Sequence, residues 1–409
     1  IVVKIGAENA LVNVATANNI VFEDNSAGNM FTIKDYYEKV SFGKLSIPKH
    51  PVEKVYTLDA PQINCPTPND IDDEKITDSI FDIFGKSIQA ADLDVDFKQF
   101  SRIIIFHPPV SCIPFPGISS IGKIVFETPD GTVRASVAFI NYKDFIPPQP
   151  SGMSNDDYAN LKRILHFVLP AHEFGHNFGL NHANRAQKRV DTNDYESFEQ
   201  EDLYDVMGAS INHLNAPHKE EAVWLNPENI VVIDSQIDPP TKFTEYLLEP
   251  LETTPSLNTI HQIKLRLKSP PKVFECRVVC NDPQCTDTSK QCSPVSHHYS
   301  SADKVYYTLE FRQPIDYDSG WPDNNNPYGG VIIHISADPK NVPFKTNLIN
   351  YEVHRNNQNQ IDGFPPKLKV GQTFEDSVNG YKVTLIDLGV GGARVRIDKI
   401  TSGTANFGG

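Results

Sequence analysis

The sequence lacks the features of a membrane-spanning or nucleic-acid-binding protein. No apolar run approaches the roughly 18 residues of a membrane-spanning helix, and the most apolar stretches, such as residues 102–106, have the length of a strand. Basic residues are outnumbered, with 37 Lys and Arg against 52 Asp and Glu, which gives a net charge of −15. Because a surface of this sign repels phosphate backbones, we expect no nucleic-acid partner. Because no apolar run is long enough, we also expect no membrane span.

Cysteine is also scarce, and its distribution is uneven. Four of the six cysteines lie in one polar stretch, and two lie elsewhere: Cys276, Cys280, Cys285 and Cys292, then Cys65 and Cys112. A zinc knuckle usually contains C-x2-C pairs, whereas three, four and six residues separate the clustered cysteines here. We therefore interpret the cluster as disulfide-bonded, which implies an oxidising compartment. Three pairings of the four clustered cysteines stay open.

Helical periodicity is confined to the N-terminal part of the chain. Helices are predicted around residues 33–40, over residues 73–91 and from about Ser154 onwards. Pro170 is expected to kink this last helix or to restart it just before His172. A turn followed by a strand is predicted over residues 41–47, and strands are predicted over residues 101–109 and 133–142.

The pattern changes at about residue 233, where helical periodicity nearly vanishes. Short alternating or apolar segments then recur between turns, at residues 246–251, 260–267, 304–311, 330–336, 381–388 and 393–397. This spacing is typical of an antiparallel β domain, most often a sandwich. A chain of 409 residues has room for two or three domains, so we predict one domain over residues 1–232 and another over 233–409.

The most informative stretch is HEFGHNFGLNH, residues 172–182. His172 and His176 are four residues apart, so on a helix their imidazoles project from one face and can reach a single cation. Glu173 would lie beside that cation, where it could hold a water molecule and take its proton. Gly179 permits a sharp turn that would bring His182 back as a third imidazole.

A helix whose histidines only fill the core is the simpler interpretation. H-E-x-x-H occurs by chance moderately often, but Gly179 and His182 at fixed offsets make chance much less frequent. We therefore predict a metal site. Three protein ligands leave a fourth tetrahedral position for water, which is typical of catalytic zinc rather than structural zinc.

The pattern H-E-x-x-H-x-x-G-x-x-H resembles that of the metzincin zinc metallopeptidases. That family also has a Met-turn, and Met207, one of only three methionines, follows His182 by 25 residues within the sequence DVMG. A core methionine is the alternative interpretation of Met207. Residues 36–47, 205–225 and 306–336 resemble gametolysin-type peptidases, with related features in the immune-inhibitor-A-like enzymes. The similarity covers most of the chain and is strongest at the motif.

This resemblance implies a secreted zinc endopeptidase that hydrolyses proteins with metal-activated water. It implies His172, His176 and His182 as zinc ligands, Glu173 as general base and acid, and Met207 as the Met-turn residue. The implied fold is α+β: a twisted, mostly parallel sheet with helices, followed by a β-rich domain that is a candidate for binding matrix or cell-wall material.

In related enzymes a strand above the active helix pairs with the extended polypeptide substrate. Residues 133–142 are the candidate for this strand, because they immediately precede the predicted active helix. The alternative is an internal strand with both edges occupied.

Two features near Met207 depart from a simple match. Some metzincins have a tyrosine two residues after the Met-turn methionine, where this chain has Ala209. Tyr204 precedes Met207 and is not assigned that role. The acidic stretch before Met207 could bind a structural Ca²⁺, but it contains no D-x-[DN]-x-[DN]-G pattern. We interpret it as a solvated loop.

Two other functions are compatible with parts of the sequence. In a non-catalytic adhesion or matrix-binding protein the zinc site would be vestigial, although Glu173 is intact. In zinc peptidases of the other large clan a glutamate is the third ligand, and Glu196, Glu199 and Glu201 lie at suitable distances along the chain. That assignment does not explain Gly179 with His182, so the secreted endopeptidase is the preferred hypothesis.

Overall fold

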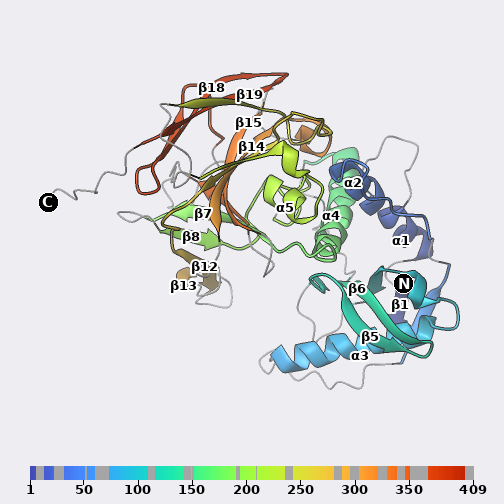
Figure 1. Ribbon diagram of the computed structural model, residues 1–409. Coiled ribbons are helices and arrows are strands. Elements are labelled where there is room, and N and C mark those ends of the chain that lie inside the picture. Colours follow the sequence, from blue (N-terminus) through green and yellow to red (C-terminus); the bar gives the residue numbers. More distant parts are fainter. Residues whose placement is uncertain are drawn as a thin grey trace. The chain divides into compact units, whose positions relative to one another are not determined.

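A computed structural model of the chain shows a mixed α/β protein that is mostly sheet (Figure 1). The structure describes residues 1–5, 13–22, 32–50, 53–59, 73–108, 116–141, 149, 152–189, 194–208, 210–234, 243–280, 288–294, 304–320, 329–338, 346–350 and 367–400. The chain divides into two compact units, Ile1–Leu180 and Asn181–Gly409, which we call the N-terminal and C-terminal units.

The N-terminal unit is built around a six-stranded sheet. Its helices are α1 (Val14–Val21), α2 (Ile33–Val40), α3 (Asp73–Ala91), the 3₁₀ helix η2 (Phe97–Gln99) and α4 (Asn155–His176). Its strands are β1 (Val2–Ile5), β2 (Val55–Leu58), β3 (Arg102–His107), β4 (Gly117–Ser119), β5 (Ile124–Thr128) and β6 (Gly131–Asn141).

The order in this sheet is β2-β1-β3-β6-β4, with β5 pairing the first half of β6. Neighbours from β2 to β6 run parallel, whereas β4 and β5 run antiparallel to β6. Alternate side chains of β3 and β6, such as Ile103 and Val137, enter one core with α3. Helix α4 contacts β6 and β4, and Figure 1 shows α3 and α4 on opposite sides of the sheet.

The predicted helices over residues 33–40 and 73–91 are confirmed, and the third begins at Asn155 as expected. Of the two outcomes expected at Pro170, a kink or a restart, the restart does not occur, because α4 continues past the proline to His176. Aromatic contacts stabilise the helix on both sides of Pro170: Phe167 contacts Tyr36, and Phe174 contacts Tyr37. Of the turn and strand expected over residues 41–47, the turn is present, with positive φ at residues 42 and 43, whereas no strand forms in this segment.

The described residues of the C-terminal unit form two sheets and one short α-helix. Its elements up to residue 250 are β7 (Ala183–Lys188), β8 (Tyr195–Phe198), α5 (Ala216–Glu221), η3 (Pro227–Asn229), β9 (Ile230–Ile233) and β10 (Thr244–Leu248). The later ones are β11 (Gln262–Arg266), β12 (Val273–Cys280), β13 (Thr288–Pro294), β14 (Val305–Arg312), η4 (Asp316–Gly320), β15 (Gly330–Ala337), β16 (Thr346–Asn350), β17 (Thr373–Asp376), β18 (Tyr381–Gly389) and β19 (Gly392–Lys399).

All six segments predicted as strands in this part overlap strands of the structure. The smaller sheet, β10-β19-β18-β17, is antiparallel throughout. The larger has the order β13-β12-β8-β7-β16-β15-β14-β11-β9 and includes three parallel pairs. One hydrophobic core contains side chains of both sheets, for example Val383 and Val395 with Ile333 and Leu309.

The boundary between the two compact units follows Leu180, which is earlier in the chain than the domain boundary that we expected at residue 232. Strands β7 and β8 belong to the nine-stranded sheet, where β7 pairs β16 and β8 pairs β12. Strand β12 lies about eighty residues after β8, and β16 lies more than one hundred and sixty residues after β7. Local periodicity therefore does not reveal either pairing. The assignment of a peptidase domain and a β-rich domain stays a prediction.

One disulfide bond, Cys276–Cys292, joins β12 to β13 at a position where the two residues face each other in register. It selects one of the three pairings that the sequence left open. Cys280 ends β12, and Cys65, Cys112 and Cys285 lie outside the described residues.

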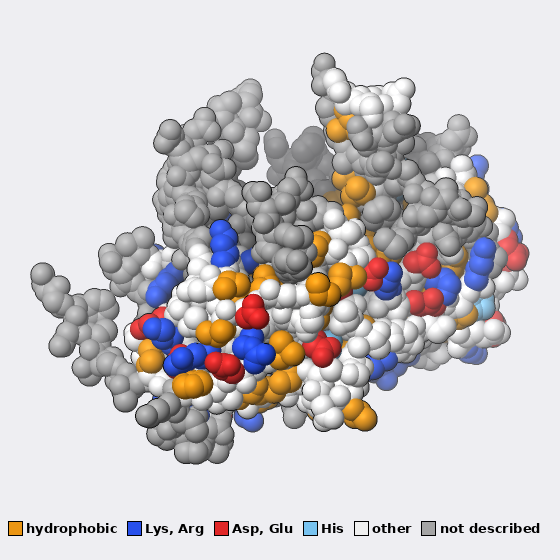
Figure 2. Space-filling view, turned by 90° about the horizontal axis from the view of Figure 1, so that it is seen from above, with side chains coloured by type: hydrophobic (Ala, Val, Ile, Leu, Met, Phe, Trp, Pro, Cys, Tyr) orange, Lys and Arg blue, Asp and Glu red, His pale blue; other side chains and the backbone are white. Residues whose placement is uncertain are grey.

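The described surface carries charges of both signs. Figure 2 shows Lys and Arg side chains beside Asp and Glu side chains on the face that it draws. Ion pairs on the four-stranded sheet include Arg394–Glu245 and Arg396–Asp398. Within the described part of the chain, no helix is both long and apolar enough to cross a membrane.

Candidate metal centre

The predicted chain reversal after α4 is present. The helix ends at His176, and Gly179 adopts a φ of +94° in the turn that follows. The N–H of Gly179 donates to the carbonyl oxygen of His176 at 2.8 Å, which closes the turn. Since this φ is strained for any residue with a side chain, glycine is the residue that allows the reversal.

The reversal brings the three histidines of the motif together. One ring nitrogen from each of His172, His176 and His182 lies within 4.8 Å of the others, so these residues could hold a metal ion. His172 and His176 are 7% and 6% exposed, and His182 is half-buried. This convergence, which the spacing alone predicted, is observed.

Hydrogen bonds orient two of the three rings. The Nδ1 of His176 donates to the carbonyl oxygen of Leu180 at 2.7 Å, and the Nδ1 of His182 donates to Glu199 Oε1 at 2.8 Å. Because Nδ1 carries the proton in both bonds, the lone pair of each ring lies on Nε2. The side-chain amide of Gln200 donates to that atom of His182 at 3.0 Å, which marks it as the acceptor that a metal would engage. Metal-binding histidines are usually fixed by such bonds through their second nitrogen.

This arrangement bears on the alternative with a glutamate as third ligand. Glu199 contacts the third histidine, and Glu201 pairs with Arg185. Among the described residues, none of Glu196, Glu199 and Glu201 joins His172 and His176 in a group that could hold a metal. The sequence suggested Glu199 as a possible ligand, whereas the structure makes it the partner of a histidine.

Glu173 lies beside these histidines and is only 5% exposed. Burial raises the pKa of its carboxyl to about 7, and the nearby Ser119 hydroxyl opposes this with a smaller lowering effect. Within the described part of the chain, Glu173 Oε2 has no hydrogen-bond partner. The other oxygen, Oε1, packs against Gly117, where an added Cβ would lie only 2.5 Å away. Among the described residues, Glu173 therefore keeps one carboxylate oxygen without a hydrogen bond, and nothing in the sequence indicates that Gly117 or Ser119 adjoins it.

The strand at the sheet edge is not the one expected. Residues 133–142 were the candidate for pairing with substrate, but β6 is internal, with β3 on one side and β4 and β5 on the other. The strand order ends at β4, which contacts α4. The segment of Gly117–Ser119 is too short to be recognised from alternation, so the sequence could not distinguish it from a loop.

Met207 is fully buried in a turn of the C-terminal unit. Its carbonyl oxygen accepts a hydrogen bond from the N–H of Ala183 at 2.9 Å, and Ala183 directly follows His182. Gly208 follows Met207 in this turn and packs closely against the backbone of Asp202. A Cβ at Gly208 would lie 2.1 Å from the carbonyl oxygen of Asp202. Ala209 lies outside the described residues.

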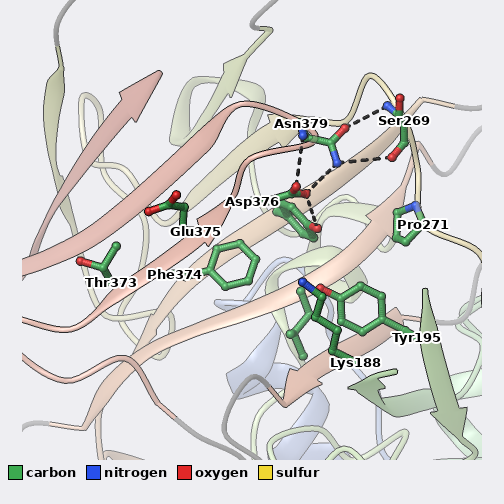
Figure 3. A pocket seen from close by; sticks show the side chains of 11 residues that line it. Lys188, Tyr195, Ser269, Pro271, Thr373, Phe374, Glu375, Asp376 and Asn379 are labelled. Carbon is green, nitrogen blue, oxygen red and sulfur yellow. Dashed lines mark hydrogen bonds between the residues drawn. The ribbon is translucent and has the colours of Figure 1, made fainter. Parts of the chain in front are cut away.

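A separate pocket of about 230 Å³ lies in the C-terminal unit and is lined by both of its sheets (Figure 3). Asp376 accepts hydrogen bonds from the Tyr307 hydroxyl and from Asn379 Nδ2, each at 2.7 Å. Asn379 in turn bonds the backbone of Ser269. Asp376, Tyr307 and Asn379 therefore bond one another at this pocket, beside the buried ring of Phe374.

The three histidines and Glu173 are therefore the best candidate site of the described residues. No protein-family model matches the chain, and no curated protein is significantly similar to it. The functional assignment accordingly depends on the residues themselves.

Proposed function

We propose that the protein is a secreted zinc-dependent endopeptidase. The observation that carries this proposal is the convergence of three imidazoles beside a buried glutamate that keeps one carboxylate oxygen unpartnered among the described residues. A metal and a base at one place are the two requirements for activating water. The disulfide Cys276–Cys292 supports an oxidising compartment, and therefore secretion.

The chemistry of the donors favours zinc. His172, His176 and His182 supply only imidazole nitrogen, which suits Zn²⁺ better than Ca²⁺ or Mg²⁺. Three such ligands are the usual number for a catalytic zinc with an open position. Zn²⁺ bound there would acidify water and polarise the carbonyl group of a peptide bond.

The remaining steps belong to the chain itself. Glu173 would accept a proton from the attacking water through its unpartnered oxygen and return it to the amine of the leaving peptide. The contact with Gly117 fixes the position of the carboxylate, and burial excludes bulk water from it. Leu180 and Glu199 would hold two of the ligand rings in orientation.

The sheet edge offers a place for an extended substrate. Strand β4 pairs with β6 on one side only within the described sheet, and Gly117 in β4 lies against Glu173. An unfolded polypeptide that adds to this edge would pass next to the carboxylate. We therefore propose β4, in place of residues 133–142, as the strand that pairs with substrate.

The decisive experiment compares wild type with Glu173→Gln, which preserves side-chain volume beside Gly117. Each protein is assayed for zinc content and for cleavage of casein. We expect the variant to retain zinc and to lose cleavage. Wild-type protein that binds zinc but cleaves no member of a broad peptide panel would instead favour a binding protein, and wild type without zinc affinity would exclude the metal site.

A further inference from the structure

A buried turn in the C-terminal unit is fixed by two aspartates. The carboxylate of Asp202 accepts the N–H of Tyr204 at 2.9 Å, and Asp205 Oδ1 accepts the N–H of Met207 at 2.7 Å. The backbone carbonyl of Asp205 also accepts the N–H of Gly208 at 2.9 Å. Both aspartates are fully buried, and each bonds the backbone two residues further on, which is the geometry of an Asx-turn.

The same turn is bonded to the residue that follows His182. Ala183 donates its N–H to the carbonyl of Met207 at 2.9 Å and accepts the N–H of Asp202 at 3.3 Å. Its backbone is thus held from two points of the turn. The backbones of Gly208 and Asp202 lie close together, since a Cβ added to Gly208 would lie 2.1 Å from the carbonyl oxygen of Asp202. Any displacement of the turn would therefore move the start of β7 and the adjoining His182.

The negative charges of the turn are neutralised inside the protein. Asp205 Oδ2 accepts the N–H of Asn215 and the Nδ1 of His218, both at 2.7 Å, and Asp202 accepts the Nε2 of His334 at 3.0 Å. Burial opposes the charge of His218, but the carboxylate of Asp205 outweighs this and raises the pKa of the imidazole. Asp205 thus joins the turn to α5 through a buried ion pair.

We infer that Asp205 is a positioning residue for the third metal ligand. It fixes the turn of Met207, the turn fixes the backbone of Ala183, and Ala183 fixes the starting point of His182. This inference rests on the proposed metal site but not on its peptidase activity. A purely structural aspartate would contribute to the stability of the C-terminal unit without a specific effect on the retention of metal.

The test uses zinc itself as the probe. Wild type, Asp205→Asn and a matched control, Asp376→Asn, are loaded with zinc, and transfer to an excess of a chromophoric chelator is timed. Asp376 is a suitable control because it also caps a turn of the same unit, accepting the N–H groups of Val378 and Asn379. We expect Asp205→Asn to release zinc about tenfold faster than wild type, the usual cost of losing an indirect support of a ligand. The control should release it at the wild-type rate.

Release at equal rates from Asp205→Asn and wild type would overturn the inference, as would equal acceleration in both variants. If wild type binds no zinc, the proposed function and the inference fail together. If zinc binds but no peptide is cleaved, only the proposed function fails.

A measurement on unaltered protein covers the case in which Asp205→Asn does not fold. Hydrogen exchange of the amides of Ala183 and Met207 is followed with and without zinc. We expect both amides to stay protected after zinc is removed, since Asp205 and not the metal holds the turn. Loss of their protection on zinc removal would overturn the inference.

Discussion

Gly117→Ala is the most direct test of the geometry around Glu173. A Cβ at this position would lie 2.5 Å from Glu173 Oε1, 2.7 Å from Cγ and 2.8 Å from Cδ. Ordinary contacts between such atoms are about 3.5 Å or longer, so the carboxylate must retreat by roughly 1 Å. The backbone of Gly117 has no positive φ, and therefore alanine itself fits the strand.

A shift of this size is expected to impair catalysis more than folding. Displacement of a reacting group by roughly 1 Å can cost about 100-fold in rate, which corresponds to about 2.7 kcal/mol in activation free energy. The three atoms nearest to a Cβ at Gly117 all belong to Glu173 and none to a histidine, so the zinc content should remain that of wild type. The expected result is a loss of about 100-fold in kcat/KM on a fluorogenic peptide with unchanged zinc.

Gly85→Ala is the matched control, since Gly85 is exposed in α3 and a Cβ there meets nothing within 4 Å. This variant should keep full activity and gain about 0.5–1 kcal/mol in stability, because alanine is the better helix former. If Gly117→Ala retains activity within a factor of two while zinc stays bound, the reasoning about the carboxylate is refuted.

Three further predictions concern other parts of the molecule. Glu199→Gln should weaken zinc affinity about tenfold in a chelator competition, because an amide orients the third imidazole less strongly than a carboxylate does; unchanged affinity would count against that role. Replacing Cys276 and Cys292 with serine should lower the free energy of unfolding by about 3 kcal/mol in urea titrations, given their separation of 16 residues, and an unaltered midpoint would contradict this. In the His218–Asp205 pair the imidazole pKa is raised and the carboxyl pKa is lowered. The contribution of the pair to the free energy of unfolding should therefore be complete between about pH 4 and 6.5. This contribution should decline as the pH rises through the pKa of His218, and also as the pH falls through the pKa of Asp205. Unfolding of wild type and His218→Asn compared over this range should show the largest difference inside that window, and a difference independent of pH would disprove the ion pair.

The parts of the site that the sequence predicted are those with local causes. Histidines four residues apart share a helix face, and Gly179 is needed wherever the chain reverses with positive φ. Both rules act within eleven residues, so the convergence of His172, His176 and His182 followed from spacing.

The parts that the sequence missed depend on contacts between distant segments. Gly117 reaches Glu173 across 56 positions, and nothing around it distinguishes this glycine from the others. Strand β4 is only three residues long, so it gave no pattern. Asp205 was visible beside Met207, but its partner His218 lies in a helix that the sequence did not predict. The pairing of β7 with β16 likewise has no local sequence pattern that predicts it.

The position of β7 within its sheet has a consequence for biosynthesis. This strand directly follows His182 and is flanked by β8 and by β16, whose residues Thr346–Asn350 are among the later ones to be translated. The surroundings of the third imidazole therefore stay incomplete in a nascent chain until residues Thr346–Asn350 have left the ribosome. The peptidase activity proposed above would be absent before that stage, which would spare the segments that are synthesised earlier.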